Sequence, residues 1–169
     1  DVIERALSKS EKTNIEEIIY EVYGPQGTAF LIRAQTDNKN RTTGEIKHLI
    51  SNYGKLAEPG SVLWMFEEKG VIEILKESFN ELWIDELANF GLEDFKETKD
   101  NGNSLIMLIC DSKNIFELQK IITAKGAKTE SCETQFLPKN LINVNNETRE
   151  NLNQFIEKIL DQPDTSAIY

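Results

Sequence analysis

Residues with catalytic chemistry are sparse in this chain, and they do not group into a known catalytic motif. The single histidine, His48, stands beside Lys47 in a stretch with helical periodicity. Neighbouring carboxylates such as Glu67 and Glu68 could act as general acid and base. With 29 Asp and Glu residues in the chain, however, such neighbours arise by chance and are typical of a solvated surface. The sequence therefore predicts no enzyme and no catalytic residue.

The patterns of metal and cofactor sites are also missing. Cys110 and Cys132 stand far apart, with no CxxC motif and no nearby histidine, so we expect free thiols that pack as small apolar side chains. Asp161 and Asp164 flank a loop that could hold a cation, but the oxygen-ligand spacing of a calcium loop is not found. Phosphate-loop and dinucleotide fingerprints are not found either. We expect no metal ion and no cofactor.

Positive charge gathers in one segment of an otherwise acidic chain. The formal net charge is −10, which disfavours nonspecific binding to phosphate backbones. Between residues 33 and 55 the balance reverses, because five cations stand against two carboxylates. The cations are Arg33, Lys39, Arg41, Lys47 and Lys55, and the carboxylates are Asp37 and Glu45. An anionic partner would be met here.

Part of this segment leads into a predicted helix, which favours anion binding. The polar box of residues 36–42 (TDNKNRT) ends in the capping-box pattern Thr42-x-x-Glu45. A helix amino terminus carries partial positive charge and free N–H groups. The candidate nucleic-acid-binding residues are Arg33, Lys39, Asn40, Arg41, Lys47 and His48. The alternative is an ordinary solvated strand-to-helix loop, and the residue types leave both open.

The elements that must position this segment follow from periodicity. Runs rich in β-branched residues predict strands over 15–22 and 28–35, joined by a turn that contains glycine and proline. Apolar residues at i, i+3, i+4 and i+7 predict a helix over 46–53. A third strand is predicted over 61–66, with Trp64 packed in the core.

A second series of elements begins near residue 70. The predicted strands are 71–75, 95–98, 105–110 and 128–136, with helices around 83–90 and 115–122. The order βαββαβ is the ferredoxin-like pattern. Residues 145–160 then carry an amphipathic stripe, and 167–169 could form a last strand. The class is α+β with largely antiparallel sheets, but spacing alone does not say to which unit the C-terminal helix and strand belong.

Several motifs, taken in order, resemble those of the YebC-like family. They are Tyr23-Gly24-Pro25-Gln26-Gly27, the polar box 36–42, and Gly60-Ser61-Val62 followed by Phe66 and Lys69-Gly70. The resemblance extends over nearly the whole chain. It implies a second domain built from residues 14–69 plus 138–169, a ferredoxin-like third domain inserted at 70–137, and the tail of a helical N-terminal domain at 1–13.

The resemblance also implies a non-enzymatic regulator of gene expression. The first hypothesis is a DNA-binding transcriptional regulator. The second is a ribosome- or RNA-associated translation factor that uses the same surface on ribosomal or messenger RNA. The third is an acidic protein-interaction module. The expected location is the bacterial cytoplasm, with the mitochondrial matrix as the alternative, no membrane association, and a monomer as the favoured state.

The chain departs from the family pattern in places. Gln26 stands where the turn usually has a glycine, which reduces backbone freedom there. Residues 162–166 replace a more acidic loop. The basic helical domain, which should make the strongest contact with nucleic acid, is expected to be missing from the N-terminus.

Overall fold

The chain folds into two compact units, each with a four-stranded sheet. The computed structural model describes residues 14–100 and 102–169, so the prediction for residues 1–13 lies outside the described part. Residues 14–64 together with Asn140–Tyr169 form one unit, here called the discontinuous unit. Met65–Lys139 forms the other, the inserted unit. Strand pairing is antiparallel in both sheets, and the predicted α+β class is confirmed.

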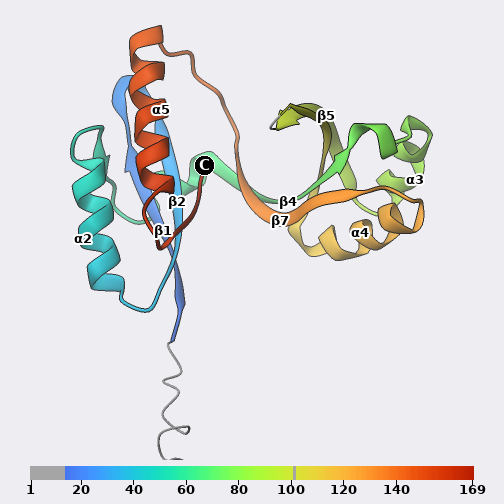
Figure 1. Ribbon diagram of the computed structural model, residues 1–169, viewed down its shortest axis with the longest axis horizontal. Helices are drawn as coiled ribbons and strands as arrows, with labels where there is room; N and C mark the ends of the chain where they lie inside the picture. Colours follow the sequence, from blue (N-terminus) through green and yellow to red (C-terminus); the bar gives the residue numbers. More distant parts are fainter. Residues whose placement is uncertain (1–13, 101) are drawn as a thin grey trace, which may run out of the picture. The chain divides into compact units, whose positions relative to one another are not determined.

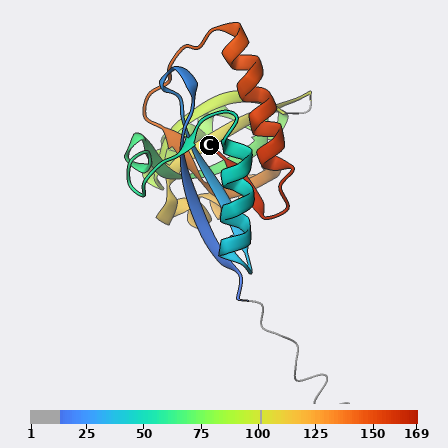
Figure 2. The same cartoon turned by 90° about the vertical axis from the view of Figure 1, so that its left-hand side faces the viewer.

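The discontinuous unit packs two helices on one face of its sheet, as Figures 1 and 2 show. The strand order is β3-β1-β2-β8. The elements are β1 (Glu16–Tyr23), β2 (Ala29–Thr36), α2 (Lys39–Ile50), β3 (Lys55–Leu56), α5 (Asn146–Leu160) and β8 (Thr165–Ile168). Both helices contribute to one apolar core, in which Ile46 of α2 and Phe155 of α5 meet Ile32 of β2. The C-terminal helix and strand therefore belong to this unit.

The β1–β2 hairpin is in register along its full length, from Glu16↔Thr36 to Tyr23↔Ala29. Its connection contains the 3-10 turn Pro25–Gly27. Gln26 has a φ of 55° there, in the left-handed region that favours glycine. The substitution noted in the sequence thus stands at a position where a side chain adds backbone strain.

Helix α2 begins earlier than the predicted capping box. Asn38 is its N-cap, and the side-chain Oδ1 accepts the N–H of Arg41 at 3.1 Å. Thr42, predicted as the cap, is fully buried inside the helix and bonds to side chains outside it. The capping-box prediction was wrong because Asn38 supplies an equally good acceptor one turn upstream.

The predicted strand over 61–66 is also wrong. Residues Leu63–Met65 form a 3-10 turn, and β4 begins only at Phe66. The physical reason is the carboxylate of Glu21, which accepts backbone N–H groups from Gly60, Val62 and Leu63 and so holds the segment in a turn. Trp64 is 63% exposed rather than packed in a core.

The inserted unit has the strand order β5-β6-β4-β7, the order of a ferredoxin-like sheet. Its elements are β4 (Phe66–Leu75), α3 (Ile84–Asn89), β5 (Leu92–Asp100), β6 (Asn103–Asp111), α4 (Ile115–Ala124) and β7 (Thr129–Pro138). β4 is longer than the predicted strand 71–75, because it pairs with β7 from Phe66↔Pro138 onward. Contacts place the limits of the unit at Met65 and Lys139, beside the expected 70 and 137.

The core of the inserted unit contains the buried Cys110, close to Gly70 of β4. A Cβ at Gly70 would lie 2.8 Å from the Sγ of Cys110 and 2.9 Å from the Cβ of Ile115, so glycine lets α4 approach the strand. Burial raises the pKa of Cys110 to about 11. Cys110 and the half-buried Cys132 are both free thiols, as the sequence predicted.

Candidate nucleic-acid interface

Helix α2 carries five of the six candidate residues at its two ends. Lys39, Asn40 and Arg41 form its first turn, and Lys47 and His48 lie in its last turn. All five side chains are exposed. The helix itself is anchored by the buried Ile46 and Ile50, whose packing leaves the polar positions at the surface.

Arg41 is held by two carboxylates of its own chain. Its Nη2 lies 3.1 Å from Asp37 and 3.0 Å from Asp164. Asp164 also accepts hydrogen bonds from the hydroxyls of Thr42 at 2.5 Å and Thr36 at 3.3 Å. The bond from Thr42, followed by that from Arg41, lowers the pKa of Asp164 below its ordinary value. This network ties the loop before β8 to the start of α2 and offsets the charge of Arg41.

Arg33 lies apart from the helix candidates. It belongs to β2, between Ile32 and Ala34, which both face the core beneath the helices. Because side chains alternate along a strand, Arg33 projects from the opposite face of the sheet. Its guanidinium lies over the ring of Tyr169, 5.2 Å from the ring centroid. The structure therefore does not bring Arg33 together with the α2 residues.

Lys39 and Lys47 line a groove between α2 and β1, with a volume of about 640 Å³. Lys55 of β3 is a third cation in the lining of this β1 groove, and Glu58 is its exposed carboxylate. The floor carries apolar side chains, among them Ile18 and Ile50. Lys55 is not among the candidate residues predicted from the sequence. Its position beside α2 arises only from the short pairing of β3 with β1, which residue spacing does not reveal.

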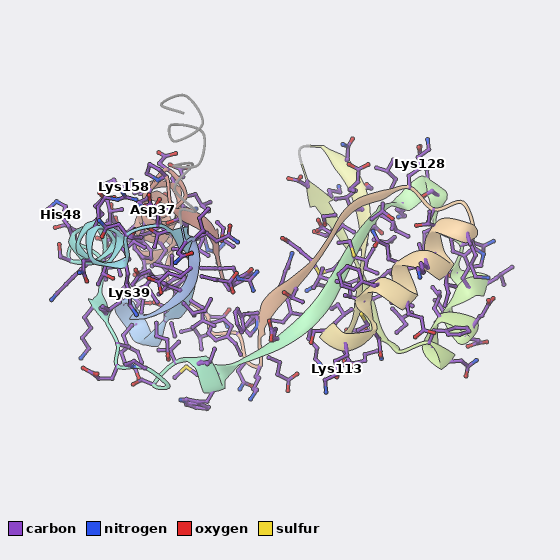
Figure 3. The ribbon with its side chains drawn as sticks, turned by 90° about the horizontal axis from the view of Figure 1, so that it is seen from below. Asp37, Lys39, His48, Lys113, Lys128 and Lys158 are labelled. Carbon is purple, nitrogen blue, oxygen red and sulfur yellow. The ribbon has the colours of Figure 1, made fainter. Side chains whose placement is uncertain are left out.

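His48 lies on the other side of α2, toward α5. A hollow of about 430 Å³ there is lined by Glu45, His48, Leu49, Lys158, Asp161 and Gln162. Figure 3 shows His48 on the side of Lys158, whereas Lys39 leaves the helix in another direction. Lys158 donates to the hydroxyl of Tyr53 at 2.8 Å. Charge on this side is mixed, since Glu45 and Asp161 line the same hollow as Lys158.

Trp64 is an exposed aromatic side chain that the sequence placed in the core. Its Nε1 donates to the carbonyl of Ser61 at 2.9 Å, which fixes the indole beside the turn. The alternation of apolar residues over 63–66 resembled a buried strand, and the signal that the segment is a turn, the carboxylate of Glu21, lies about 40 residues upstream. Local periodicity could not reveal it.

Residues 14–100 and 102–169 contain no group of three or more His, Cys, Asp or Glu side chains arranged to hold a metal ion. None of the helices in these ranges has the length and apolar character needed to cross a membrane.

Known proteins resemble this chain over nearly its whole length. A probable transcriptional regulatory protein of Thermotoga petrophila is 39% identical over 99% of the chain, which spans 65% of that protein. A second, of Caldanaerobacter subterraneus, is 40% identical over 99% of the chain and 68% of its own length. A crystal structure of a conserved hypothetical protein from Aquifex aeolicus aligns with a TM-score of 0.84 at 26% identity, covering 99% of this chain and 70% of that one. The family model described as TACO1/YebC second and third domain matches residues 15–169, and the chain belongs to that family.

Proposed function

We propose that this chain is part of a bacterial cytoplasmic regulator of gene expression that acts by binding DNA and catalyses no reaction. The observation that carries the proposal is the set of three exposed lysines in the β1 groove, Lys39, Lys47 and Lys55. None of them forms a salt bridge with a carboxylate of the described residues. The names of the bacterial relatives, probable transcriptional regulatory proteins, support the same function.

The three ammonium groups would act on the phosphate backbone. Lysine binds phosphate as a point charge on a flexible stem, so these contacts position the protein and do not read sequence. Each phosphate contact with B-DNA contributes about −0.9 to the slope of log affinity against log salt. Three contacts therefore predict a slope of roughly −3 and an affinity that falls steeply with salt.

The test compares two pairs of lysines with equal charge. Lys39→Gln with Lys47→Gln removes two cations of the β1 groove. Lys113→Gln with Lys128→Gln removes two exposed cations of the inserted unit (Figure 3) and leaves the same net charge. Binding to a fluorescent DNA duplex and to an RNA hairpin of equal length is measured by anisotropy over a salt series.

We expect the groove pair to reduce the magnitude of the salt slope on DNA by about 2, and the control pair to leave it unchanged. Equal decreases of the salt slope in the groove pair and the control pair would show that the lysines act only through net charge. Binding to the RNA hairpin without binding to DNA would replace the transcriptional function with a role on RNA.

A further inference from the structure

Residues 16–20 of β1 form an edge of the sheet in the part of the chain that the structure describes. β3 covers β1 only at Val22↔Leu56 and Tyr23↔Lys55, and the N–H of Ala57 donates to the carbonyl of Glu21. In the part of the chain that the structure describes, no strand pairs with residues 16–20 on this side. An exposed strand edge of this kind is a template for another strand.

The pairing pattern shows which backbone groups point outward. Leu31 exchanges both of its hydrogen bonds with Tyr169, on the far side of β2. Glu21, opposite Leu31, therefore does not exchange hydrogen bonds with β2, and its carbonyl turns to Ala57 instead. Two residues along the strand, Ile19 has the same orientation, so its N–H and C=O both point out of the sheet beside the β1 groove.

We propose that the β1 groove binds an extended acidic segment of a partner protein, which adds a strand to β1 beside Ile19. The partner's backbone would pair with the outward N–H and C=O, which supplies affinity, and its side chains would supply specificity. Carboxylates on the segment would face Lys39, Lys47 and Lys55 along the groove walls. The alternate side chains of the segment would lie on the opposite face of the sheet, the face to which Ile19 projects. This interaction goes beyond the proposed binding of DNA.

The geometry favours a peptide over a single nucleic-acid strand. Ile19 offers a donor and an acceptor side by side, and an extended peptide supplies the complement of both, whereas a phosphodiester backbone supplies acceptors only. The aromatic ring that lines the groove, Tyr20, is 6% exposed, and its hydroxyl is hydrogen-bonded to Thr43 at 2.9 Å. It therefore presents no free ring face for base stacking.

Self-pairing of two β1 edges is disfavoured by charge. An antiparallel pairing centred on Ile19 would set Glu17 of each copy opposite Glu21 of the other. Like charges directly opposite each other destabilise a strand pair. A heterologous acidic segment avoids the clash if it places apolar or polar residues opposite Glu17.

The acidic segment and DNA would compete for the same lysines. Lys39 and Lys47 would serve both ligands, so an acidic segment in the groove would displace the phosphate backbone. The two ligands are distinguished by Ile19, whose outward N–H serves only the added strand.

The test uses the 169-residue chain and two variants of Ile19. Ile19→Pro removes the outward N–H and keeps the hydrogen bonds between β1 and β2, since proline is tolerated on edge strands. Ile19→Thr keeps the N–H and is the matched control. The probe is a synthetic peptide of about eight residues, a common strand length, with alternating Val and Glu. A Val and Lys peptide and a single-stranded oligonucleotide are run beside it.

We expect the acidic peptide to shift the amide resonances of Ile19 and Lys47. The Ile19→Pro substitution should weaken the affinity for this peptide about tenfold. Ile19→Thr should stay within about twofold. Methylation of the peptide nitrogens on the edge that pairs with β1 should abolish binding. Methylation of the nitrogens on the opposite edge should leave binding unchanged. The proposal would be overturned if the Lys peptide bound as well as the acidic peptide, or if a folded Ile19→Pro variant bound the acidic peptide undiminished. It would also be overturned if Ile19→Pro lost binding to the oligonucleotide and kept binding to the peptide. DNA affinity of Ile19→Pro is measured in parallel and should not change, so failure of one proposal leaves the other testable.

Discussion

Cations on the two sides of helix α2 have different partners. On the side of β1, Lys39 and Lys47 line a groove with Lys55, without a salt bridge to any described carboxylate. On the side of α5 and the loop before β8, Arg41 lies between two carboxylates, Asp37 and Asp164. The fold thus divides a run of positive charge in the sequence into charge that lines a groove and charge that is paired with carboxylates.

Each side depends on one partly or fully buried carboxylate. Glu21 accepts three backbone N–H groups at 2.5–2.8 Å and anchors the loop that continues from β3 toward β4. Asp164 accepts from Thr42, Thr36 and Arg41 and anchors the start of α2. Removing either carboxylate therefore tests one side of the comparison at a time.

The largest effect is expected from Glu21→Gln. Glu21 is 7% exposed, and the substitution replaces one acceptor oxygen with an NH₂ group that faces an amide donor. Charge-assisted hydrogen bonds of this kind contribute about 1.5–3 kcal/mol each, so we expect a loss of roughly 3 kcal/mol in the free energy of unfolding. Urea denaturation measures it. Glu17→Gln, an exposed site on the same strand, is the control, and an equal loss there would contradict the role of Glu21.

Asp164→Asn should have the next largest effect. It weakens the bonds to Thr42 and Arg41 at a partly exposed site, and we expect about 1–2 kcal/mol of lost stability. The same variant frees Arg41 from one of its two carboxylates, so DNA affinity should rise severalfold at low salt. Asp161→Asn, exposed in the same loop, is the matched control. Lower DNA affinity in Asp164→Asn than in Asp161→Asn would contradict the role of Asp164 in offsetting the charge of Arg41.

Acid should destabilise the fold through the same two carboxylates. Burial alone would raise the pKa of Glu21, but its three amide hydrogen bonds together outweigh burial and lower the pKa below the ordinary 4.5. The pKa of Asp164 is likewise below its ordinary 3.8, chiefly through Thr42. A lowered folded-state pKa means that the stabilisation is present above the unfolded-state value and is lost as pH falls through the folded-state value. The free energy of unfolding should therefore decline below about pH 4.5, with a smaller slope in Glu21→Gln and Asp164→Asn. An unchanged slope in both variants would rule out this source of acid sensitivity.

Local signals in the sequence predicted most of the architecture. The β1–β2 hairpin, helices α2 and α5 and the βαββαβ order of the inserted unit follow from periodicity and turn residues, which depend on neighbours in the chain. The ends of segments were less predictable. The cap at Asn38 competed with an equally plausible pattern at Thr42, and only tertiary contacts decided between them.

The division of the candidate site could not be predicted at all. Arg41 meets Asp164 across 123 residues of sequence, and Glu21 fixes Val62 across 41. Neither pair leaves a signature in residue spacing. Charge counting gives Arg41 and Lys47 equal weight, whereas the fold pairs Arg41 with carboxylates and leaves Lys47 in a groove lined by lysines.

The salt slope of DNA binding, measured in Lys47→Gln and in Arg41→Gln, decides whether the two sides of α2 differ in binding. Both variants remove one positive charge from the same helix, so net charge is matched. Measured on folded protein, Lys47→Gln should reduce the magnitude of the slope by about 1, and Arg41→Gln should leave it unchanged. A reduction in Arg41→Gln equal to or greater than that in Lys47→Gln would contradict the claim that the fold reserves the β1 side of α2 for binding.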